Sequence, residues 1–310
     1  MAERTRQRAI LIAGPTGSGK SAAALELARR LGGLIVNADA MQVYAELKVL
    51  TARPGPEEER SVPHRLFGHV PAGQAYSVGR WLAEARHALA EAWGEGRVAV
   101  VVGGTGLYFR SLEQGLSDIP QVTQEVRPKW RRALAERGAR ALHGELGARA
   151  PEEARRLRPS DGQRIARALE VLEATGEALT AHHARASSTS PFAGVDVIRV
   201  AIIPDRAALY RRCDERFLQM LEDGALDEVR RLVALDLEPG LPAMRAIGVA
   251  PLARHLSGDI GLHEAVRIAQ RETRNYAKRQ LTWLRHRMPA YEPVTDAPAA
   301  VARCLDLYGR

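Results

Sequence analysis

A glycine-rich segment between an apolar run and a helical pattern constrains this chain more than any other feature. Residues 14–21 read Gly-Pro-Thr-Gly-Ser-Gly-Lys-Ser, after the apolar residues 9–13 and before the helical pattern of residues 22–28. Glycines let a loop curl so that successive backbone N–H groups point at phosphate oxygens, and the next helix N-terminus adds partial positive charge. The segment predicts a phosphate-binding loop (P-loop) between a strand and a helix of an α/β fold.

The residues of the P-loop have separate expected roles. We expect Gly14 and Gly19 to form the turns, Lys20 to reach a terminal phosphate, and the hydroxyl of Ser21 to ligate the accompanying Mg²⁺. The candidate diphosphate ligands in the loop are Gly14, Pro15, Thr16, Gly17, Ser18, Gly19, Lys20 and Ser21. The loop alone does not identify the molecule that carries the phosphates.

Alternating apolar runs and helical patterns indicate the sheet. Residues 34–38 and 97–102 read as buried parallel strands, with a helical stretch from about Ser77 to Trp93 between them, and residues 197–203 are a later candidate strand. This alternation predicts a doubly wound parallel sheet, whose ligands gather at the carboxyl ends of the strands. The P-loop, Asp39 and Thr105 should therefore converge.

The pattern changes near residue 118 to short helical segments, which predicts an insertion in the core. We expect the first part of a P-loop core in residues 1–117, an all-helical insertion in residues 118–195, and completion of the core with C-terminal helices in residues 196–310. A chain of 310 residues is long enough to bury a sizeable core in such an arrangement.

Composition excludes several other classes of protein. Hydrophobic residues make up 45% and charged residues 26%, as in globular proteins, and no apolar stretch is long enough for a signal peptide or a membrane span. We therefore expect a cytoplasmic protein that does not bind membranes. Cys213 and Cys304 lack the spacing of a zinc site or a disulfide framework, and we expect both to be packing residues.

Positive charge permits a polyanionic partner. Lysine and arginine number 45 against 37 acidic residues, a net charge of +8. Residues 264–287 contain seven basic residues and two acidic ones, whereas the arginines of residues 127–167 are interleaved with carboxylates. A solvated helix face explains the second cluster about as well as a contact with RNA does.

Asp39 is the carboxylate that strand logic places beside the P-loop. It directly follows residues 34–38, whereas the strand at residues 98–102 ends in glycines. Asp39 can serve as a metal ligand, as a general base, or as a cap of the following turn. The residues alone leave these three alternatives open.

An ordered set of motifs resembles those of bacterial tRNA dimethylallyltransferases. The motifs occupy residues 14–21, 37–44, 63–66, 102–108, 161–171, 216–221, 245–248 and 278–285. Their order carries the specificity, because each motif other than the P-loop is weak alone. The resemblance extends from about Ile10 to Arg287.

This resemblance implies transfer of a dimethylallyl group from dimethylallyl diphosphate to N6 of adenosine 37, which is 3′ to the anticodon of tRNA. It implies that Lys20 stabilises the leaving diphosphate, that Asp39 is the general base, and that Thr105 hydrogen-bonds near the adenine or the diphosphate. Arg216 is a candidate second cation for the diphosphate. Its alternative role is a helix-surface ion pair with Asp214 or Glu215.

The implied partners are dimethylallyl diphosphate and the anticodon stem-loop of tRNA, bound by a monomer. Ser160 and Gln163 have the spacing of a capping box, which places Gln163, Arg164 and Arg167 in the first turns of a helix. The candidate tRNA-binding residues are Asp39, Ala40, Met41, Gln42, Thr105, Arg127, Gln163, Arg164, Ile165, Ala166, Arg167, Arg245, Lys278 and Arg279.

Two other classes fit the P-loop. A nucleoside or small-molecule kinase would use Asp39 as its base and the insertion as a lid, and would bind ATP. A P-loop switch or ATPase would need a carboxylate after residues 98–102, which is missing. Among single residues, His64 is more often structural than catalytic in such a loop, and Tyr108 and Trp283 are expected in the core.

Overall fold

The computed structural model describes residues 7–116, 125–184 and 190–310. The chain divides into two compact units: a larger unit, Met1–Glu113 with Pro191–Arg310, and a helical unit, Gln114–Ser190. The start of the insertion expected at residue 118 lies outside the described residues, and its end at Ser190 precedes the expected residue 195. The larger unit is therefore made from both ends of the chain.

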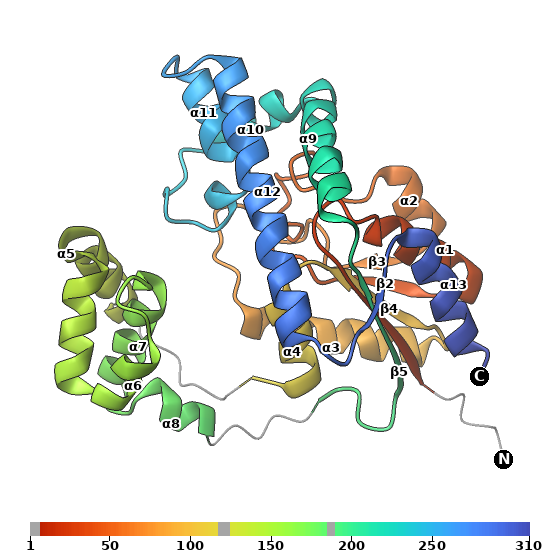
Figure 1. The fold of residues 1–310 in the computed structure, drawn as a ribbon, viewed down its shortest axis with the longest axis horizontal. Helices are drawn as coiled ribbons and strands as arrows, with labels where there is room; N and C mark the ends of the chain where they lie inside the picture. Colours follow the sequence, from red (N-terminus) through yellow and green to blue (C-terminus); the bar gives the residue numbers. More distant parts are fainter. Residues whose placement is uncertain (1–6, 117–124, 185–189) are drawn as a thin grey trace. The chain divides into compact units, whose positions relative to one another are not determined.

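A six-stranded parallel sheet forms the centre of the larger unit (Figure 1). Its order is β3-β2-β4-β1-β5-β6, so β1 lies between β4 and β5, and Ile10 pairs with both Val100 and Ile198. The strands are β1 (Arg8–Ala13), β2 (Leu34–Asn37), β3 (His64–Arg65), β4 (Ala99–Gly103), β5 (Asp196–Ile202) and β6 (Glu292–Val294). The predicted doubly wound parallel sheet is confirmed.

Two short edge strands were not predicted. β3 has two residues and lies in a polar, proline-containing segment, and β6 has three residues between Met288 and Asp296. The C-terminal part therefore contains more than β5 and the expected helices, because β6 adds to the sheet beside β5. Neither strand is long enough to show a two-residue period of hydrophobicity.

Helices cover the sheet and extend beyond its carboxyl edge. They are α1 (Lys20–Leu31), α2 (Pro56–Ser61), α3 (Val78–Gly94), α4 (Gly106–Gln114), α9 (Arg206–Glu222), α10 (Ala225–Val233), the 3₁₀ turn η1 (Ala243–Arg245), α11 (Val249–Leu256), α12 (Leu262–Arg287) and α13 (Ala297–Tyr308). Figure 1 shows α1 and α13 side by side. They pack on the sheet through Ala24, Leu27 and Cys304 against Ile10 and Val100.

The helical unit has a core of its own. It contains α5 (Val126–Arg149), α6 (Pro151–Arg156), α7 (Gly162–Thr175) and α8 (Leu179–Ala184). Trp130, Leu142, Leu146, Ile165 and Leu169 are buried together. Fully burying an aliphatic side chain stabilises a fold by roughly 1.5–3 kcal/mol, so this cluster gives the small unit its stability.

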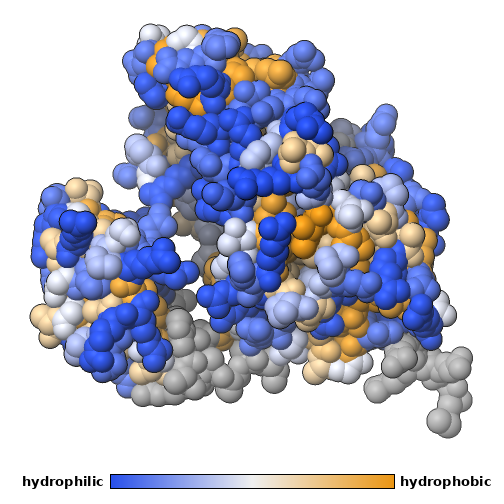
Figure 2. Space-filling model, in the orientation of Figure 1, coloured by the Kyte–Doolittle hydropathy of each residue, from blue (hydrophilic) through white to orange (hydrophobic). Residues whose placement is uncertain are grey.

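Hydrophilic side chains cover most of the visible surface of the larger unit, with apolar side chains in smaller patches (Figure 2). None of the described helices combines the length and the apolar character that crossing a bilayer requires.

Candidate active site

The P-loop joins β1 to α1 at the carboxyl edge of the sheet. Gly17 and Gly19 have φ values of 77° and 87°, a backbone region that residues other than glycine rarely adopt. Gly14 is needed for a different reason, since a Cβ there would lie 2.6 Å from Ser18 Oγ. The turn residues are thus Gly17 and Gly19, and the expectation for Gly14 is corrected.

Lys20 begins α1 and is partly buried below the loop. Its Nζ donates a hydrogen bond to the carbonyl of Pro15 at 3.3 Å. Burial lowers the pKa of Lys20 to about 8, and the carboxylate of Asp39 opposes that shift. A lysine held in this way gains a proton readily when an anion enters the loop.

Asp39 is positioned by the buried side chain of Asn37 at the end of β2. Asn37 Oδ1 accepts the N–H of Asp39 at 2.8 Å, and Asn37 Nδ2 donates to the carbonyl of Asp39 at 3.0 Å. Asp39 Oδ1 accepts the N–H of Met41 at 3.0 Å, so the carboxylate does cap the following turn. Within the described residues Asp39 Oδ2 accepts no hydrogen bond. This oxygen is therefore available to accept a proton or a ligand.

Thr105 links the end of β4 to the Asp39 turn. Its Oγ1 accepts the N–H of Ala40 at 3.0 Å, and its own N–H donates to the carbonyl of Ala38 at 3.2 Å. The Thr105 hydroxyl also lies close to the phenol of Tyr276. The P-loop, Asp39 and Thr105 therefore converge, as the strand order requires.

Tyr276 adds an unpredicted hydroxyl to this group. Burial raises the pKa of Tyr276, and the nearby carboxylate of Asp39 raises it further, while the Thr105 hydroxyl lowers it. The phenol therefore stays protonated.

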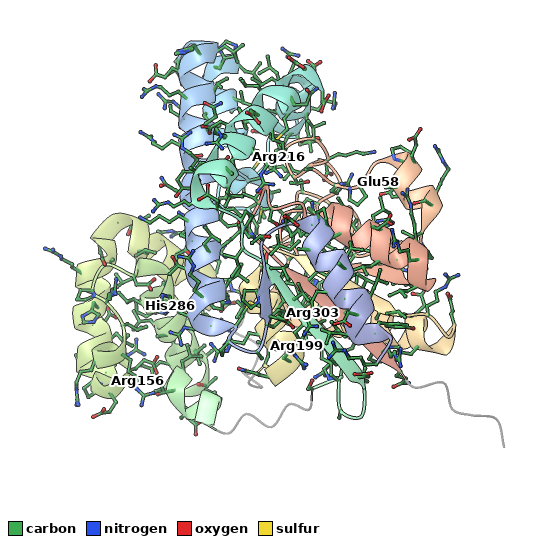
Figure 3. All side chains as sticks on the ribbon, turned by 45° about the vertical axis from the view of Figure 1, so that its right-hand side comes forward. Glu58, Arg156, Arg199, Arg216, His286 and Arg303 are labelled. Atoms are coloured by element: carbon green, nitrogen blue, oxygen red, sulfur yellow. The ribbon has the colours of Figure 1, made fainter. Side chains whose placement is uncertain are left out.

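Arg216, on α9, faces the P-loop (Figure 3). Its Nη2 donates to Oγ1 of Thr16, and withdrawal from water lowers the pKa of the guanidinium. The alternative ion pair with Asp214 does not form, because Asp214 pairs with Arg274 at 2.5 Å. Arg216 is thus a second cation beside the loop, next to Lys20.

A cavity of about 260 Å³ opens beside Thr16, Asp39 and Arg216, and its lining combines polar and apolar side chains. Its polar lining includes Thr16, Asp39, Arg216, Arg245, Tyr276 and Arg279. Its apolar lining includes Met41, Leu50, Phe217, Met220 and Ile247. The arrangement suits a ligand with an anionic head and a short hydrocarbon tail.

The apolar wall is held from a distant part of the chain. Glu228, on α10, is buried and accepts the N–H groups of Lys48 and Val49 at 2.7 Å and of Leu50 at 3.0 Å. Its carboxylate therefore fixes the segment that carries Leu50 into the cavity.

The candidate tRNA-binding residues of the larger unit have different surroundings. Ala40, Met41, Arg245 and Arg279 line the cavity. The amide of Gln42 instead donates to the carbonyls of Thr51 and Ala52 at 2.8 and 3.0 Å, so these bonds hold its own loop.

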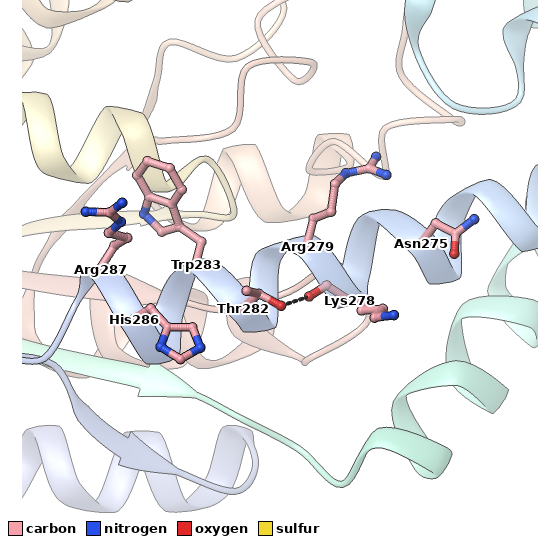
Figure 4. A pocket seen from close by; sticks show the side chains of 7 residues that line it. All are labelled: Asn275, Lys278, Arg279, Thr282, Trp283, His286 and Arg287. Atoms are coloured by element: carbon pink, nitrogen blue, oxygen red, sulfur yellow. Dashed lines mark hydrogen bonds between the residues drawn. The ribbon is translucent and has the colours of Figure 1, made fainter. Parts of the chain in front are cut away.

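A groove along α12 is lined by further nitrogen-bearing side chains (Figure 4). Lys278, Arg279, His286 and Arg287 line it together with Trp283, and Arg279, Trp283 and Arg287 extend to one side of the helix. Trp283 is only partly buried, so the expectation of a core residue is wrong for it, whereas Tyr108 is buried and stacks on Trp81 at 4.1 Å.

In the helical unit, the arginine candidates are paired with carboxylates. Arg127 and Arg167 both approach Oε2 of the buried Glu170, at 3.8 and 3.1 Å. Gln163 and Arg164 are exposed at the start of α7. Asp161, and not Ser160, caps that helix by accepting the N–H of Arg164.

Two candidates of this unit need correction. Ile165 and Ala166 are 0% and 4% exposed and belong to its core, so their side chains do not form an RNA-binding surface. Their neighbours Gln163, Arg164 and Arg167 face outward because the helical period turns residues 165 and 166 inward.

His64 lies away from the cavity. Its Nδ1 is 3.0 Å from the carbonyl of Val62, its ring packs edge-on against Phe67, and burial lowers its pKa. These contacts describe a structural histidine.

Sequence reasoning missed Tyr276, Gln280 and Glu228. Tyr276 and Gln280 are four residues apart on α12, a spacing that marks one helix face and could have signalled them. Glu228 gives no such signal, because its partners are backbone groups about 180 residues away. Cys213 is buried as expected and also lines the cavity.

A P-loop, a carboxylate and arginine side chains beside one cavity define the class of P-loop enzymes. Comparisons with known proteins narrow this class. A family model described as IPP transferase matches residues 42–287, and one described as isopentenyl transferase matches residues 7–67. The chain therefore belongs to the IPP transferase family.

Relatives and solved structures agree with that assignment. The tRNA dimethylallyltransferase of Nitrobacter hamburgensis is 52% identical over 91% of this chain and 89% of its own. That of Chelativorans sp. is 53% identical over 90% and 96%. The fold is similar to a eukaryotic dimethylallyltransferase acting on tRNA, with a TM-score of 0.82 and 26% identity over 96% of this chain and 78% of that one. It is also similar to the tRNA isopentenylpyrophosphate transferase of Bacillus halodurans, with a TM-score of 0.70 and 29% identity over 98% and 96% of the two chains.

Proposed function

We propose that this chain transfers a dimethylallyl group from dimethylallyl diphosphate to N6 of adenosine 37 of tRNA and releases diphosphate. The observation that carries the proposal is the cavity beside the P-loop, whose lining combines arginine side chains with apolar ones. The diphosphate would lie against Lys20 and Arg216, and the five-carbon tail against Leu50, Phe217 and Met220.

A kinase fits the cavity less well. ATP would place a ribose and an adenine beyond its phosphates, and both need polar partners. Much of the cavity lining offers instead aliphatic and aromatic carbon and thioether sulfur. The relatives are also named as transferases of the dimethylallyl group.

Departure of the diphosphate is the first requirement, since an exocyclic adenine amine is a weak nucleophile. Lys20, Arg216 and the N–H groups of the P-loop supply fixed positive charge where negative charge develops on the leaving group. The buried hydroxyl of Ser18 has no hydrogen-bond partner among the described residues, which is expected of a group that binds the diphosphate.

Mg²⁺ is part of the proposal. Among the described residues, no three His, Cys, Asp or Glu side chains gather as a metal site. The exposed hydroxyl of Ser21 suits Mg²⁺ held mainly by diphosphate oxygens and water, the way in which proteins usually bind it. Such an ion would neutralise charge on the leaving diphosphate.

Proton removal falls to Asp39. As the N6–C1 bond forms, the C1–O bond breaks with its electron pair on the diphosphate, and Asp39 Oδ2 accepts a proton from N6. The Thr105 hydroxyl holds the Asp39 turn and lies beside the position proposed for the adenine.

The tRNA must present its base to this partly buried carboxylate. Extruding a base costs a few kcal/mol, which stacking and edge contacts offset. We propose that Arg245, Lys278 and Arg279 contact the anticodon arm from the larger unit, and Arg127, Gln163, Arg164 and Arg167 from the helical unit. A monomeric, cytoplasmic enzyme would suit this substrate.

Nucleoside mass spectrometry tests the reaction. Unmodified tRNA is incubated with the protein, Mg²⁺ and dimethylallyl diphosphate, and a parallel reaction contains ATP instead. We expect dimethylallyl-adenosine in the first reaction alone, and none when guanosine replaces adenosine 37. ATP consumption without a prenylated nucleoside would instead support a kinase.

A further inference from the structure

One face of α12 reaches two loops of the active site. Thr273, Tyr276, Gln280 and Trp283 follow one another at intervals of three or four residues and so share a helix face. Thr273 and Tyr276 line the cavity, and the indole nitrogen of Trp283 lies 2.0 Å from where a Cβ on Gly106 would be. Gln280 lies between them, next to the P-loop.

The side-chain amide of Gln280 joins two backbone segments. Its Oε1 accepts the N–H of Thr16 at 2.9 Å, and its Nε2 donates to the carbonyl of Gly104 at 2.9 Å. The residue is 5% exposed, so both bonds are shielded from water. A buried amide that uses its oxygen and its nitrogen on main chain holds both segments at a fixed separation.

The two segments serve opposite sides of the reaction. Thr16 belongs to the P-loop and accepts a hydrogen bond from Arg216, so it lies on the diphosphate side. Gly104 precedes Thr105, whose hydroxyl holds the N–H of Ala40 beside the general base Asp39. Gln280 therefore spans the distance between the leaving group and the base.

The separation of the P-loop from the Asp39 turn affects whether the prenyl donor reacts with the adenine amine or with water. Reacting atoms must be held about 3–3.5 Å apart, and a displacement of 1 Å can cost roughly 10²-fold in rate. If the adenine amine is displaced, water can take its place at C1. The water oxygen then bonds to C1, the C1–O bond to the diphosphate breaks with its electron pair on the diphosphate, and the proton from water passes to solvent, which gives dimethylallyl alcohol.

We propose that Gln280 is a positioning residue that keeps the P-loop in register with the Asp39–Thr105 turn and so directs the prenyl group to the amine and not to water. The inference rests on the proposed function of the site. It assigns to α12 a role in the chemical step besides its cations.

The test measures how dimethylallyl diphosphate is partitioned between prenylated RNA and dimethylallyl alcohol, together with kcat and both KM values. Gln280→Met removes both hydrogen bonds at similar volume, and Gln280→Glu removes the donor to Gly104. We expect each variant to lower kcat by about 10–100-fold with little change in either KM. The alcohol fraction should rise at the same time.

A second variant changes Gly104, the partner of Gln280 in the same hydrogen bond. A Cβ on Gly104 would lie 2.1 Å from Gln280 Nε2, so Gly104→Ala displaces the amide while Gln280 itself is kept. We expect the same rise in the alcohol fraction. This variant keeps the test decisive if the Gln280 variants fold poorly.

Gln270 supplies the matched control. It lies on the same helix and its Nε2 donates to the carbonyl of Asp214 at 3.1 Å, outside the loops of the site. Gln270→Met should keep the wild-type partition. A wild-type partition in the Gln280 and Gly104 variants, with or without reduced thermal stability, overturns the inference. A wild-type protein that leaves RNA unmodified overturns the proposed function itself.

Discussion

Polar side chains are used in contrasting ways by the two units. In the larger unit, Asn37, Glu228 and Gln280 are buried and bond to main-chain groups around the cavity. In the helical unit, Arg127 and Arg167 are partly exposed and bond to the carboxylate of Glu170. Main-chain anchors fix a geometry, whereas arginine side chains that reach solvent remain accessible to RNA phosphates. The contrast separates a rigid chemical site from an exchangeable binding surface.

The contrast is tested most severely at Asp39, the proposed general base. Asp39→Asn keeps an acceptor for the N–H of Met41 but cannot take up the proton, so we expect turnover to fall by about 10²–10⁴-fold with tRNA still bound. Single-turnover prenylation and tRNA titration measure the two effects. Near-normal turnover would reduce Asp39 to the turn cap described above.

Arg216 tests whether the fixed cations act on the diphosphate. Arg216→Ala removes a charge-assisted hydrogen bond worth about 1.5–3 kcal/mol, so the Kd for diphosphate should rise by roughly 10–150-fold. Titration calorimetry measures it. Arg212→Ala, an exposed arginine on the same helix, should leave the affinity nearly unchanged. An equal loss in both variants would point to general charge and not to the P-loop contact.

The pH dependence of diphosphate binding tests the role of Lys20 in the chemical site. Its pKa is lowered to about 8, so the free enzyme loses the proton as pH rises through that value. The diphosphate prefers the protonated lysine, and its affinity should fall by up to about tenfold per pH unit above pH 8. Below that value Lys20 should add no dependence. Lys20→Arg should flatten the profile, because an arginine stays charged.

Arg167 carries the smallest expected effect. Arg167→Ala should weaken tRNA binding uniformly and reduce the salt dependence of log K by about one unit, while diphosphate affinity stays the same. Filter binding over a range of salt concentrations measures it, with Arg156→Ala of the same unit as control. A change in diphosphate affinity would mean that the exchangeable surface is part of the chemical site.

Local patterns in the sequence were enough to predict most of the sheet and the loops at its carboxyl edge. The apolar runs gave four of the strands of the sheet, and their carboxyl ends brought Asp39 and Thr105 to the P-loop. The helical period of residues 162–175 was also visible in the sequence. Ile165 and Ala166 were nevertheless predicted to bind tRNA because they lie within a motif, although their positions on the helix face the core. A motif groups residues that are neighbours in sequence, whereas the 3.6-residue period of a helix decides which of them face the core.

Long-range hydrogen bonds were beyond sequence reasoning. Gln280 bonds to Thr16, 264 residues away, and neither residue type predicts the other. The choice of Arg216 between a surface ion pair and the P-loop depended on how α9 packs, which its own sequence does not state. Asp214 forms its ion pair with Arg274 of α12, and Arg216 donates its hydrogen bond to Thr16 of the P-loop.

The central place of β1 in the sheet has a consequence for synthesis on the ribosome. β1 needs β5 as one neighbour, the Leu50 segment needs Glu228, and the P-loop needs Gln280. A nascent chain that has completed residues 1–113 thus carries the phosphate-binding motif without the groups that hold it in shape. Binding competence should arise late in translation, after α12 has left the exit tunnel, and a chain cut short before that helix should retain the motif without its function.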